Sequence, residues 1–151
     1  MKKRILMVCL GNICRSPLAE GILQSKLSDK DFYVDSAGTG GYHVGAQPDY
    51  RSIAVAKKHG IDISQQTCRK FIEEDFDNFD IIYVMDTNNY SDIIKQARNQ
   101  SQKDKVKLLL SETSSDKMQV PDPYYDDNGF EHVFELIDTA CKVIAAKLTT
   151  T

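Results

Sequence analysis

The stretch ILMVCLGNICRSP, residues 5–17, contains the transition that decides the fold. Its first part is a continuous apolar run that is too short for a helix, and such runs are typical of a strand buried on both faces of a sheet. Gly11 and Asn12 then tolerate a positive φ, and Ser16 and Pro17 combine a favoured N-cap with a favoured first helical residue. The stretch therefore predicts a strand, a tight loop and a helix with Ser16 as its N-cap.

Short apolar runs and helical periodicity continue to alternate along the chain. Further strands are expected at 32–35, 81–85 and 106–110, and further helices at 49–59, 88–97 and 130–148. Strands that alternate with helices predict an α/β fold in which ligands bind at the carboxyl ends of the strands. We expect a single three-layer domain over residues 1–151, with a four-stranded parallel sheet flanked by helices on both faces.

Composition and charge set limits on the function. The chain has 151 residues, of which 41 % are hydrophobic and 27 % charged, and these values favour one packed domain over a disordered chain. Its 19 Lys and Arg against 22 Asp and Glu give a net charge of −3, so no long-range field would attract nucleic acid or an anionic membrane. An anionic substrate must therefore be bound by a local arrangement of residues.

The cysteines and the first residues indicate the compartment. No apolar run approaches the roughly 18 residues of a membrane helix, and the beginning MKKRILMVCLGN has too short an apolar stretch for a secretory signal. We therefore expect a cytoplasmic protein in which Cys9, Cys14, Cys68 and Cys141 are reduced. The sequence has no Cys-x-x-C pair and only 3 histidines, so we expect no metal site.

Cys9 precedes Arg15 by six positions, and this spacing has a chemical use. A short loop that leads into a helix N-terminus points several backbone N–H groups at one place, where a phosphate dianion can bind. The planar guanidinium of Arg15 can hold two phosphate oxygens at once. The same positive surroundings favour the thiolate of Cys9, to which the Ser16 hydroxyl could donate. We predict that Cys9 attacks phosphorus and forms a cysteinyl-phosphate intermediate.

A simpler interpretation is that Cys9 is a small buried hydrophobe and that Ser16 and Pro17 merely begin a helix. Each feature alone is common in proteins. Gly11, Asn12 and Arg15 together with the helix start all serve anion binding, and this combination favours the catalytic interpretation.

Four segments resemble the low-molecular-weight protein tyrosine phosphatase family. They are CLGNICRSPLAE at 9–20, DSAGT at 35–39, Met85-Asp86 and DPYY at 122–125. The resemblance covers nearly the whole chain. It implies a phosphatase without a cofactor that acts on tyrosine-phosphorylated proteins and small aryl phosphates, and that binds phosphate or other oxyanions in its site.

The resemblance also implies roles for individual residues. Asp122 matches the general acid of the family, which then serves as the base for hydrolysis of the intermediate. Tyr42 and Tyr124 fall where the family places the aromatic walls of its pocket. The phosphate-binding residues would be those of the loop, namely Leu10, Gly11, Asn12, Ile13, Cys14 and Ser16.

Five positions add detail to the resemblance. Ile13 stands where the phosphoarginine-specific branch has Thr, which implies the phosphotyrosine branch. Cys14 resembles a second loop cysteine that could form a reversible disulfide with Cys9 under peroxide. Relatives often carry a His where this chain has Gln66, so a bracing role of that His is in doubt. Tyr124 and Tyr125 resemble positions that kinases phosphorylate in some relatives.

One alternative is a related enzyme activity on the same fold, and two others are non-hydrolytic modules of a different class. A thiol-dependent arsenate reductase would need two further cysteines as a relay, yet Cys68 and Cys141 are far apart in the sequence and Cys141 lies on an apolar helical stripe. A non-hydrolytic cysteine phosphocarrier or a phosphopeptide-binding module would not need both Arg15 and Asp122. The presence of both residues favours turnover.

Overall fold

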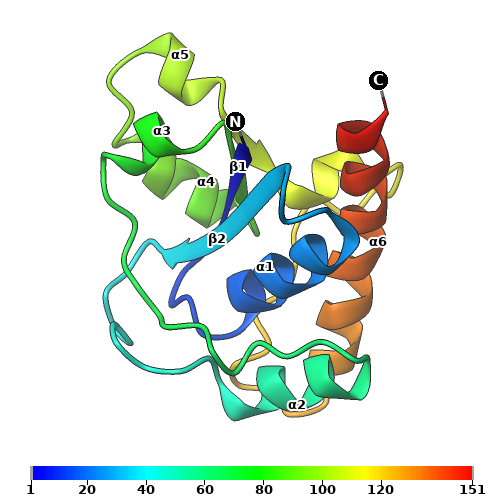
Figure 1. Cartoon of the computed structure of the whole chain (residues 1–151). Coiled ribbons are helices and arrows are strands. Elements are labelled where there is room, and N and C mark those ends of the chain that lie inside the picture. Colours follow the sequence, from blue (N-terminus) through cyan, green and yellow to red (C-terminus); the bar gives the residue numbers. More distant parts are fainter. Residues whose placement is uncertain (1, 151) are drawn as a thin grey trace.

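The computed structural model describes residues 2–150 and contains a parallel four-stranded sheet with the order β2-β1-β3-β4 (Figure 1). Its strands are β1 Lys3–Cys9, β2 Phe32–Gly38, β3 Ile81–Val84 and β4 Val106–Leu108. Helices pack against both faces of this sheet, which confirms the predicted fold class.

The helices form two layers of unequal size. The larger layer contains α1 Arg15–Lys26, α2 Tyr50–Lys58 and α6 Phe130–Thr149, which contact one another and bury one side of β1. On the other face lie α3 Asp75–Asn78 and α4 Thr87–Ile94. The chain also forms the short helix α5 Gln100–Lys103 and, after β4, the 3-10 helix η1 Leu109–Glu112.

Strand β1 is apolar on both faces because it lies at the centre of these layers. Ile5 and Met7 belong to the core beneath α1 and α6, whereas Leu6 and Val8 belong to the core beneath α4. All four side chains are fully buried. The continuous apolar run of the sequence therefore forms a strand that helices cover on both faces, as predicted.

Two element boundaries differ from the sequence predictions. Helix α1 begins at Arg15 with Cys14 at the N-cap position, so Ser16 is not the cap but lies inside the first turn. Strand β2 continues to Gly38 rather than ending at Asp35, because it pairs with β1 as far as Cys9. The longer β2 therefore arises from strand pairing, which local propensity does not include.

Other boundaries shift by a few residues. Helix α4 begins one residue earlier than predicted and ends at Ile94, and Asp86 caps it by accepting from the Asn89 N–H. The strand expected at 106–110 ends at Leu108, where the chain turns into the 3-10 helix. The predicted helix at 49–59 is α2, with Asp49 as its N-cap. Helix α6 matches its predicted range closely.

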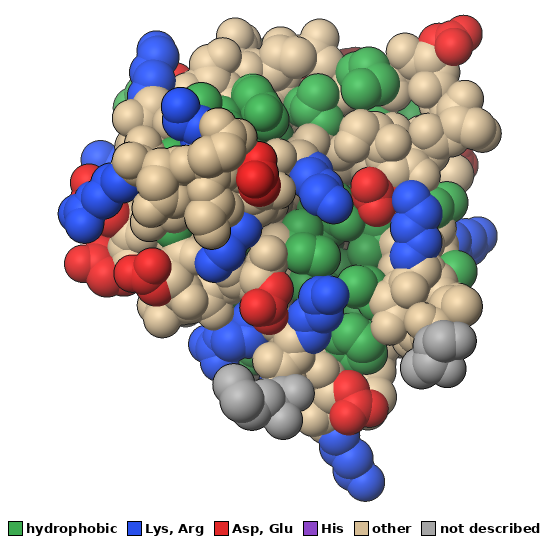
Figure 2. Space-filling model, turned by 90° about the horizontal axis from the view of Figure 1, so that it is seen from above, with side chains coloured by type: hydrophobic (Ala, Val, Ile, Leu, Met, Phe, Trp, Pro, Cys, Tyr) green, Lys and Arg blue, Asp and Glu red, His purple; other side chains and the backbone are tan. Residues whose placement is uncertain are grey.

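The face on which β1 begins and α6 ends carries charges of both signs. Figure 2 shows Lys and Arg side chains intermingled with Asp and Glu around a central apolar area on this face. Within residues 2–150, no helix is both long and apolar enough to cross a membrane.

The strand order places a ligand site at the opposite end of the sheet. The connection from β1 leads to β2 on one side, whereas β3 lies on the other side of β1. In doubly wound sheets, ligands bind where the strand order reverses, at the carboxyl ends of the strands. The loops that follow β1 and β3 meet at this point.

Gly38, at the end of β2, is required by close backbone approach. A Cβ on it would lie 2.8 Å from the carbonyl oxygen of Leu10 and 3.1 Å from the nitrogen of Asn12. Because both neighbours are backbone atoms, they cannot move aside cheaply. We expect Gly38→Ala to lower the free energy of unfolding by roughly 1–3 kcal/mol, which a denaturant melt measures.

Gly41, in the same segment, provides the control. A Cβ there would have its nearest contact at 3.6 Å, with the Lys70 side chain. Gly41→Ala should leave stability within about 0.5 kcal/mol of the parent. Equal stability of the two variants would contradict the steric argument for Gly38.

Candidate active site

The loop at residues 9–16, here called the cysteine loop, joins β1 to α1 and surrounds the sulfur of Cys9. Asn12 takes the left-handed conformation with φ 58°, which lets its backbone N–H donate to Cys9 Sγ at 3.3 Å. Ser16 Oγ lies 3.1 Å from the same sulfur, which is the contact predicted for it. Cys9 is 2 % exposed. The sulfur is therefore held between a backbone donor and a hydroxyl.

A cavity of about 340 Å³ opens above the cysteine loop. It brings together Cys9 and Arg15 with Asp122, which follows them by more than a hundred residues in the sequence. Of the residues predicted to bind substrate, six line the cavity: Leu10, Gly11, Ile13, Cys14, Tyr42 and Tyr124.

The other two predicted residues lie behind the loop instead of in the cavity wall. The side chains of Asn12 and Ser16 are buried and hydrogen-bonded to each other at 2.8 Å. Sequence reasoning missed His43 and Tyr125, which line the cavity. His43 directly follows the predicted Tyr42 and Tyr125 directly follows the predicted Tyr124, and this adjacency is the sequence feature that could have identified them.

Arg15 is a buried cation with a fixed orientation. Its Nη1 donates to Asp86 Oδ2 at 2.6 Å and to the carbonyl oxygen of Val120 at 3.0 Å. Burial alone would lower the pKa of Arg15, but Cys9 and the hydrogen bond and charge of Asp86 raise it above its ordinary value. The guanidinium therefore stays charged, and its Nη2 lies 3.7 Å from Asp122 Oδ2.

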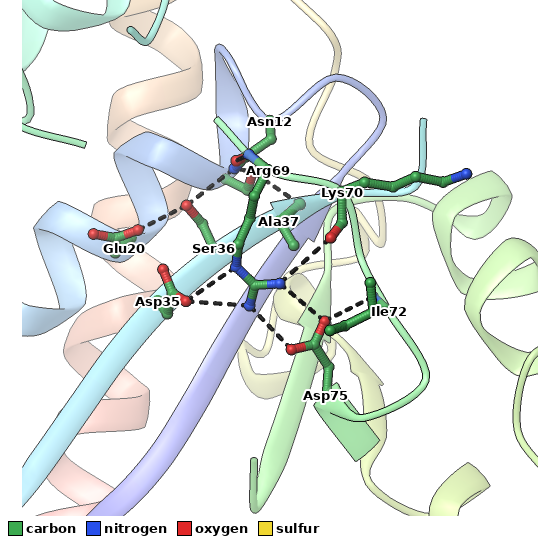
Figure 3. Close-up of polar contacts among 10 residues, drawn as sticks. Asn12, Glu20, Asp35, Ser36, Ala37, Arg69, Lys70, Ile72 and Asp75 are labelled. Carbon is green, nitrogen blue, oxygen red and sulfur yellow. Dashed lines mark hydrogen bonds and ion pairs between the residues drawn. The ribbon is translucent and has the colours of Figure 1, made fainter. Parts of the chain in front are cut away.

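Asn12 connects the cysteine loop to β2 and to a distant segment of the chain (Figure 3). Its Nδ2 donates to Ser16 Oγ at 2.8 Å and to Ser36 Oγ at 3.0 Å. Its Oδ1 accepts from the backbone N–H of Arg69 at 2.9 Å. Ser36 in turn donates to Glu20 Oε1 at 2.7 Å. These bonds fix the left-handed turn on which the position of Cys9 depends.

Arg69 secures the far end of this network. Its guanidinium pairs with Asp35 on β2 at 3.1 Å and with Asp75 at the start of α3 at 3.0 Å (Figure 3). Gln66 donates from Nε2 to the carbonyl oxygen of Pro17 at 3.0 Å. Gln66 therefore contacts the first turn of α1. Burial raises the pKa of the neighbouring Glu20 to about 7.

Asp122 lies in an exposed segment, residues 121–129, here called the acid loop. Its Oδ1 accepts from the backbone N–H of Tyr124 at 3.1 Å, and its side chain is 43 % exposed. The ring of Tyr124 contacts Tyr125 edge to face, and its centroid lies 6.4 Å from that of His43. The carboxylate thus faces the cavity beside an aromatic wall.

The remaining cysteines are poor nucleophiles near neutral pH. Burial, and then the charges of Asp49 and Cys9, raise the pKa of Cys14 to about 12. Burial likewise raises the pKa of Cys68 to about 11, and its thiol donates to the carbonyl oxygen of Asn12. Cys141 is fully buried in α6, which also raises its pKa. In the part of the chain described, no group of three or more His, Cys, Asp or Glu could hold a metal ion.

Comparisons with known proteins agree with this geometry. Residues 4–151 match the family model described as low molecular weight phosphotyrosine protein phosphatase. The human protein of that name is 38 % identical over 96 % of this chain and 95 % of its own length. A putative low molecular weight protein-tyrosine-phosphatase of Synechocystis is 43 % identical over 91 % of each chain. The crystal structure of a protein tyrosine phosphatase from Entamoeba histolytica, with Hepes in its active site, superposes with a TM-score of 0.91 at 35 % identity and covers 97 % of each chain.

The cysteine environments predict which thiol an alkylating anion modifies. Iodoacetate should label Cys9 near pH 7, because the anion-binding loop attracts it, while Cys14 stays a neutral thiol. The raised pKa of Cys14 means that its thiolate accumulates only as the pH approaches about 12. Peptide mapping by mass spectrometry checks the site of labelling, and inorganic phosphate should slow the labelling. Faster labelling of Cys14 than of Cys9 near pH 7 would contradict this assignment.

Proposed function

The chain belongs to the low molecular weight phosphotyrosine protein phosphatase family, and we propose that it hydrolyses phosphotyrosine in proteins, and small aryl phosphates, through a cysteinyl-phosphate intermediate. One observation carries the proposal. The sulfur of Cys9, the guanidinium of Arg15 and the carboxyl group of Asp122 all open on one cavity. These are a nucleophile, an anion-binding group and a proton donor, which is the set that phosphoryl transfer to sulfur requires.

In the first step, the thiolate of Cys9 attacks phosphorus from the base of the cavity. An S–P bond forms while the P–O bond to the aryl group breaks, and Asp122 donates its proton to the leaving oxygen. The N–H groups of the loop and Arg15 stabilise the charge on the equatorial oxygens. Because Asp86 holds Arg15 before substrate binds, little reorganisation is needed during the reaction.

In the second step, the intermediate is hydrolysed. Asp122, now a carboxylate, accepts a proton from a water molecule whose oxygen attacks phosphorus. The S–P bond breaks, inorganic phosphate forms, and its release regenerates the thiolate of Cys9. The Ser16 hydroxyl and the Asn12 N–H can stabilise that thiolate, because both lie within hydrogen-bonding distance of Sγ.

The shape of the cavity supports aryl over alkyl substrates. Cys9 is at the bottom, while Tyr124 and the exposed Tyr42 stand at the rim. A phosphoserine side chain is too short to bring its phosphorus from the rim to the sulfur, whereas an aryl ring spans the distance. Ile13 adds an apolar wall that suits a ring. We therefore propose tyrosine-phosphorylated proteins as the partners and, given four free thiols, the cytoplasm as the location.

The same site gives less support to the alternative activities. A reductase relay would need two further accessible cysteines near Cys9. Cys14 lines the cavity, but Cys68 is 3 % exposed and Cys141 is 0 % exposed within the core. A phosphocarrier must protect its phosphocysteine from water. Here Asp122 faces the cavity, where it can activate water.

The first variant tests the nucleophile. Cys9→Ser should abolish release of phosphate from 4-nitrophenyl phosphate, because a serine hydroxyl is a far weaker nucleophile than a thiolate. Its affinity for inorganic phosphate, measured by calorimetry, should stay within about tenfold of the parent, because Arg15 and the loop N–H groups are unchanged. Residual turnover by Cys9→Ser, or stable phosphorylation of the parent without turnover, would overturn the proposal.

The second variant tests the acid. Asp122→Asn should lower kcat/KM for phenyl phosphate by about 10²-fold or more, and much less for 4-nitrophenyl phosphate, whose leaving group needs little protonation. Steady-state kinetics over a series of aryl phosphates measures this difference. Asp126→Asn, four residues along the same exposed loop, is the matched control and should behave like the parent. An equal loss for good and poor leaving groups would remove Asp122 from the role of acid.

A further inference from the structure

The acid loop is held in place mainly by side chains that belong to other elements of the fold. The bonds within it are short-range turns, such as those from the Asp126 N–H to the Pro123 carbonyl and from the Asn128 N–H to Asp126. Gly129, the last residue of the loop, accepts from the Val133 N–H at the start of α6. Within the described chain, the other hydrogen bonds and ion pairs that tie residues 121–129 to other elements come from two arginines, Arg15 and Arg51. Arg15 lies 3.7 Å from Asp122, so Arg51 provides the close hydrogen bonds.

Arg51, in the first turn of α2, joins two segments of the chain. On one side, its Nε and Nη2 form a fork on the carboxylate of Asp49, at 3.0 and 2.9 Å. On the other side, Nη2 donates to the carbonyl oxygen of Tyr124 at 2.9 Å, and Nη1 pairs with Asp127. A planar guanidinium can serve both sides at once, whereas a lysine ammonium cannot reproduce this fork.

The start of α2 is itself bonded to the cysteine loop. The Asp49 N–H donates to the carbonyl oxygen of Ile13 at 2.8 Å. Ser52 Oγ donates to the carbonyl oxygen of Cys14 at 3.2 Å. A continuous set of hydrogen bonds therefore runs from the cysteine loop through α2 and Arg51 to the loop that carries Asp122.

Packing and charge keep this guanidinium in place. Arg51 Cζ lies 4.6 Å from the ring centroid of Phe130, the first residue of α6, and 5.6 Å from that of Tyr124. Its side chain is only 18 % exposed. Hydrogen bonds from Arg51 lower the pKa of Asp49, so the pair stays ionised at neutral pH.

We propose that Arg51 is a positioning residue that sets the distance between the carboxyl group of Asp122 and the sulfur of Cys9. The inference rests on the proposed function, because it presumes that Asp122 is the acid. Arg51 does not line the cavity and touches no reacting atom. Its effect is on the acid loop, and a displacement of about 1 Å at a proton donor is enough to slow proton transfer severely.

The test is the leaving-group dependence of Arg51→Gln. We expect kcat/KM for phenyl phosphate to fall by about tenfold or more, and kcat/KM for 4-nitrophenyl phosphate to fall by less than about threefold. Affinity for inorganic phosphate should be unchanged, because the cysteine loop keeps its donors. Arg51→Lys, which keeps the charge and one ion pair, should give an intermediate loss. Arg98→Gln removes an exposed arginine with one carboxylate partner and should match the parent.

Several outcomes would overturn the inference. A loss of equal size for both substrates would indicate a merely structural role, and no loss for either substrate would show that Arg51 does not position the acid. If Arg51→Gln does not fold, as judged by circular dichroism, Asp127→Asn replaces it, because Asp127 is 80 % exposed and its change leaves the core intact. That variant should then show a smaller loss, of about twofold to threefold, for phenyl phosphate alone. If Asp127→Asn shows no such loss for phenyl phosphate, the positioning role of Arg51 is wrong.

The Asp122→Asn variant separates the two proposals. If Asp122→Asn shows no leaving-group dependence, the proposed acid is wrong, and the inference about Arg51 fails with it. If Asp122→Asn shows the dependence and Arg51→Gln does not, the proposed function stands and the positioning role is wrong.

Discussion

The site depends on one backbone turn, the left-handed conformation of Asn12 directly after β1. This turn points the Asn12 N–H group back at Cys9 Sγ. It also lets the chain enter α1 so that Arg15 lies on the cavity side of the loop and Ser16 lies on its inner side. A positive φ is uncommon for a residue other than glycine, although asparagine tolerates it better than most, and the surroundings hold Asn12 in this conformation. The amide of Asn12 bonds to Ser16, Ser36 and the Arg69 backbone, and these bonds stabilise the turn.

The electrostatics of the site follow from burying one cation among partial and full negative charges. Arg15 is 2 % exposed, and a buried guanidinium costs several kcal/mol unless it is paired. Asp86 and the Val120 carbonyl oxygen both accept from the same nitrogen of Arg15, Nη1. Arg15 also lines the cavity, where its guanidinium can bind an oxyanion. The hydrogen bond to Asp86 therefore keeps the Arg15 guanidinium oriented toward the cavity, where it remains free to bind an anion.

The sequence predicts those parts of this arrangement that are local. A strand, a tight loop and a helix follow from residues 5–17 alone, and α6 follows from its periodicity. Cys9, Arg15 and Asp122 were predicted from chemistry and resemblance, and the cavity joins them. The support of Asn12 was not predictable, because Ser36 and Arg69 lie 24 and 57 positions away. For the same reason, the extension of β2 to Gly38 needs the pairing with β1.

The proposed nucleophile, Cys9, and the proposed acid, Asp122, are held in opposite ways, and the proposed chemistry gives a reason. Cys9 ends a buried strand and cannot move without disturbing the sheet, whereas Asp122 lies in an exposed loop held by side-chain contacts. The sulfur must meet phosphorus at one fixed angle in both steps. The carboxyl group must give a proton to a large leaving group, let it depart and then face a water molecule. A loop whose close side-chain hydrogen bonds come from the guanidinium of Arg51 can return to the same place after each departure, which a freely moving loop could not do.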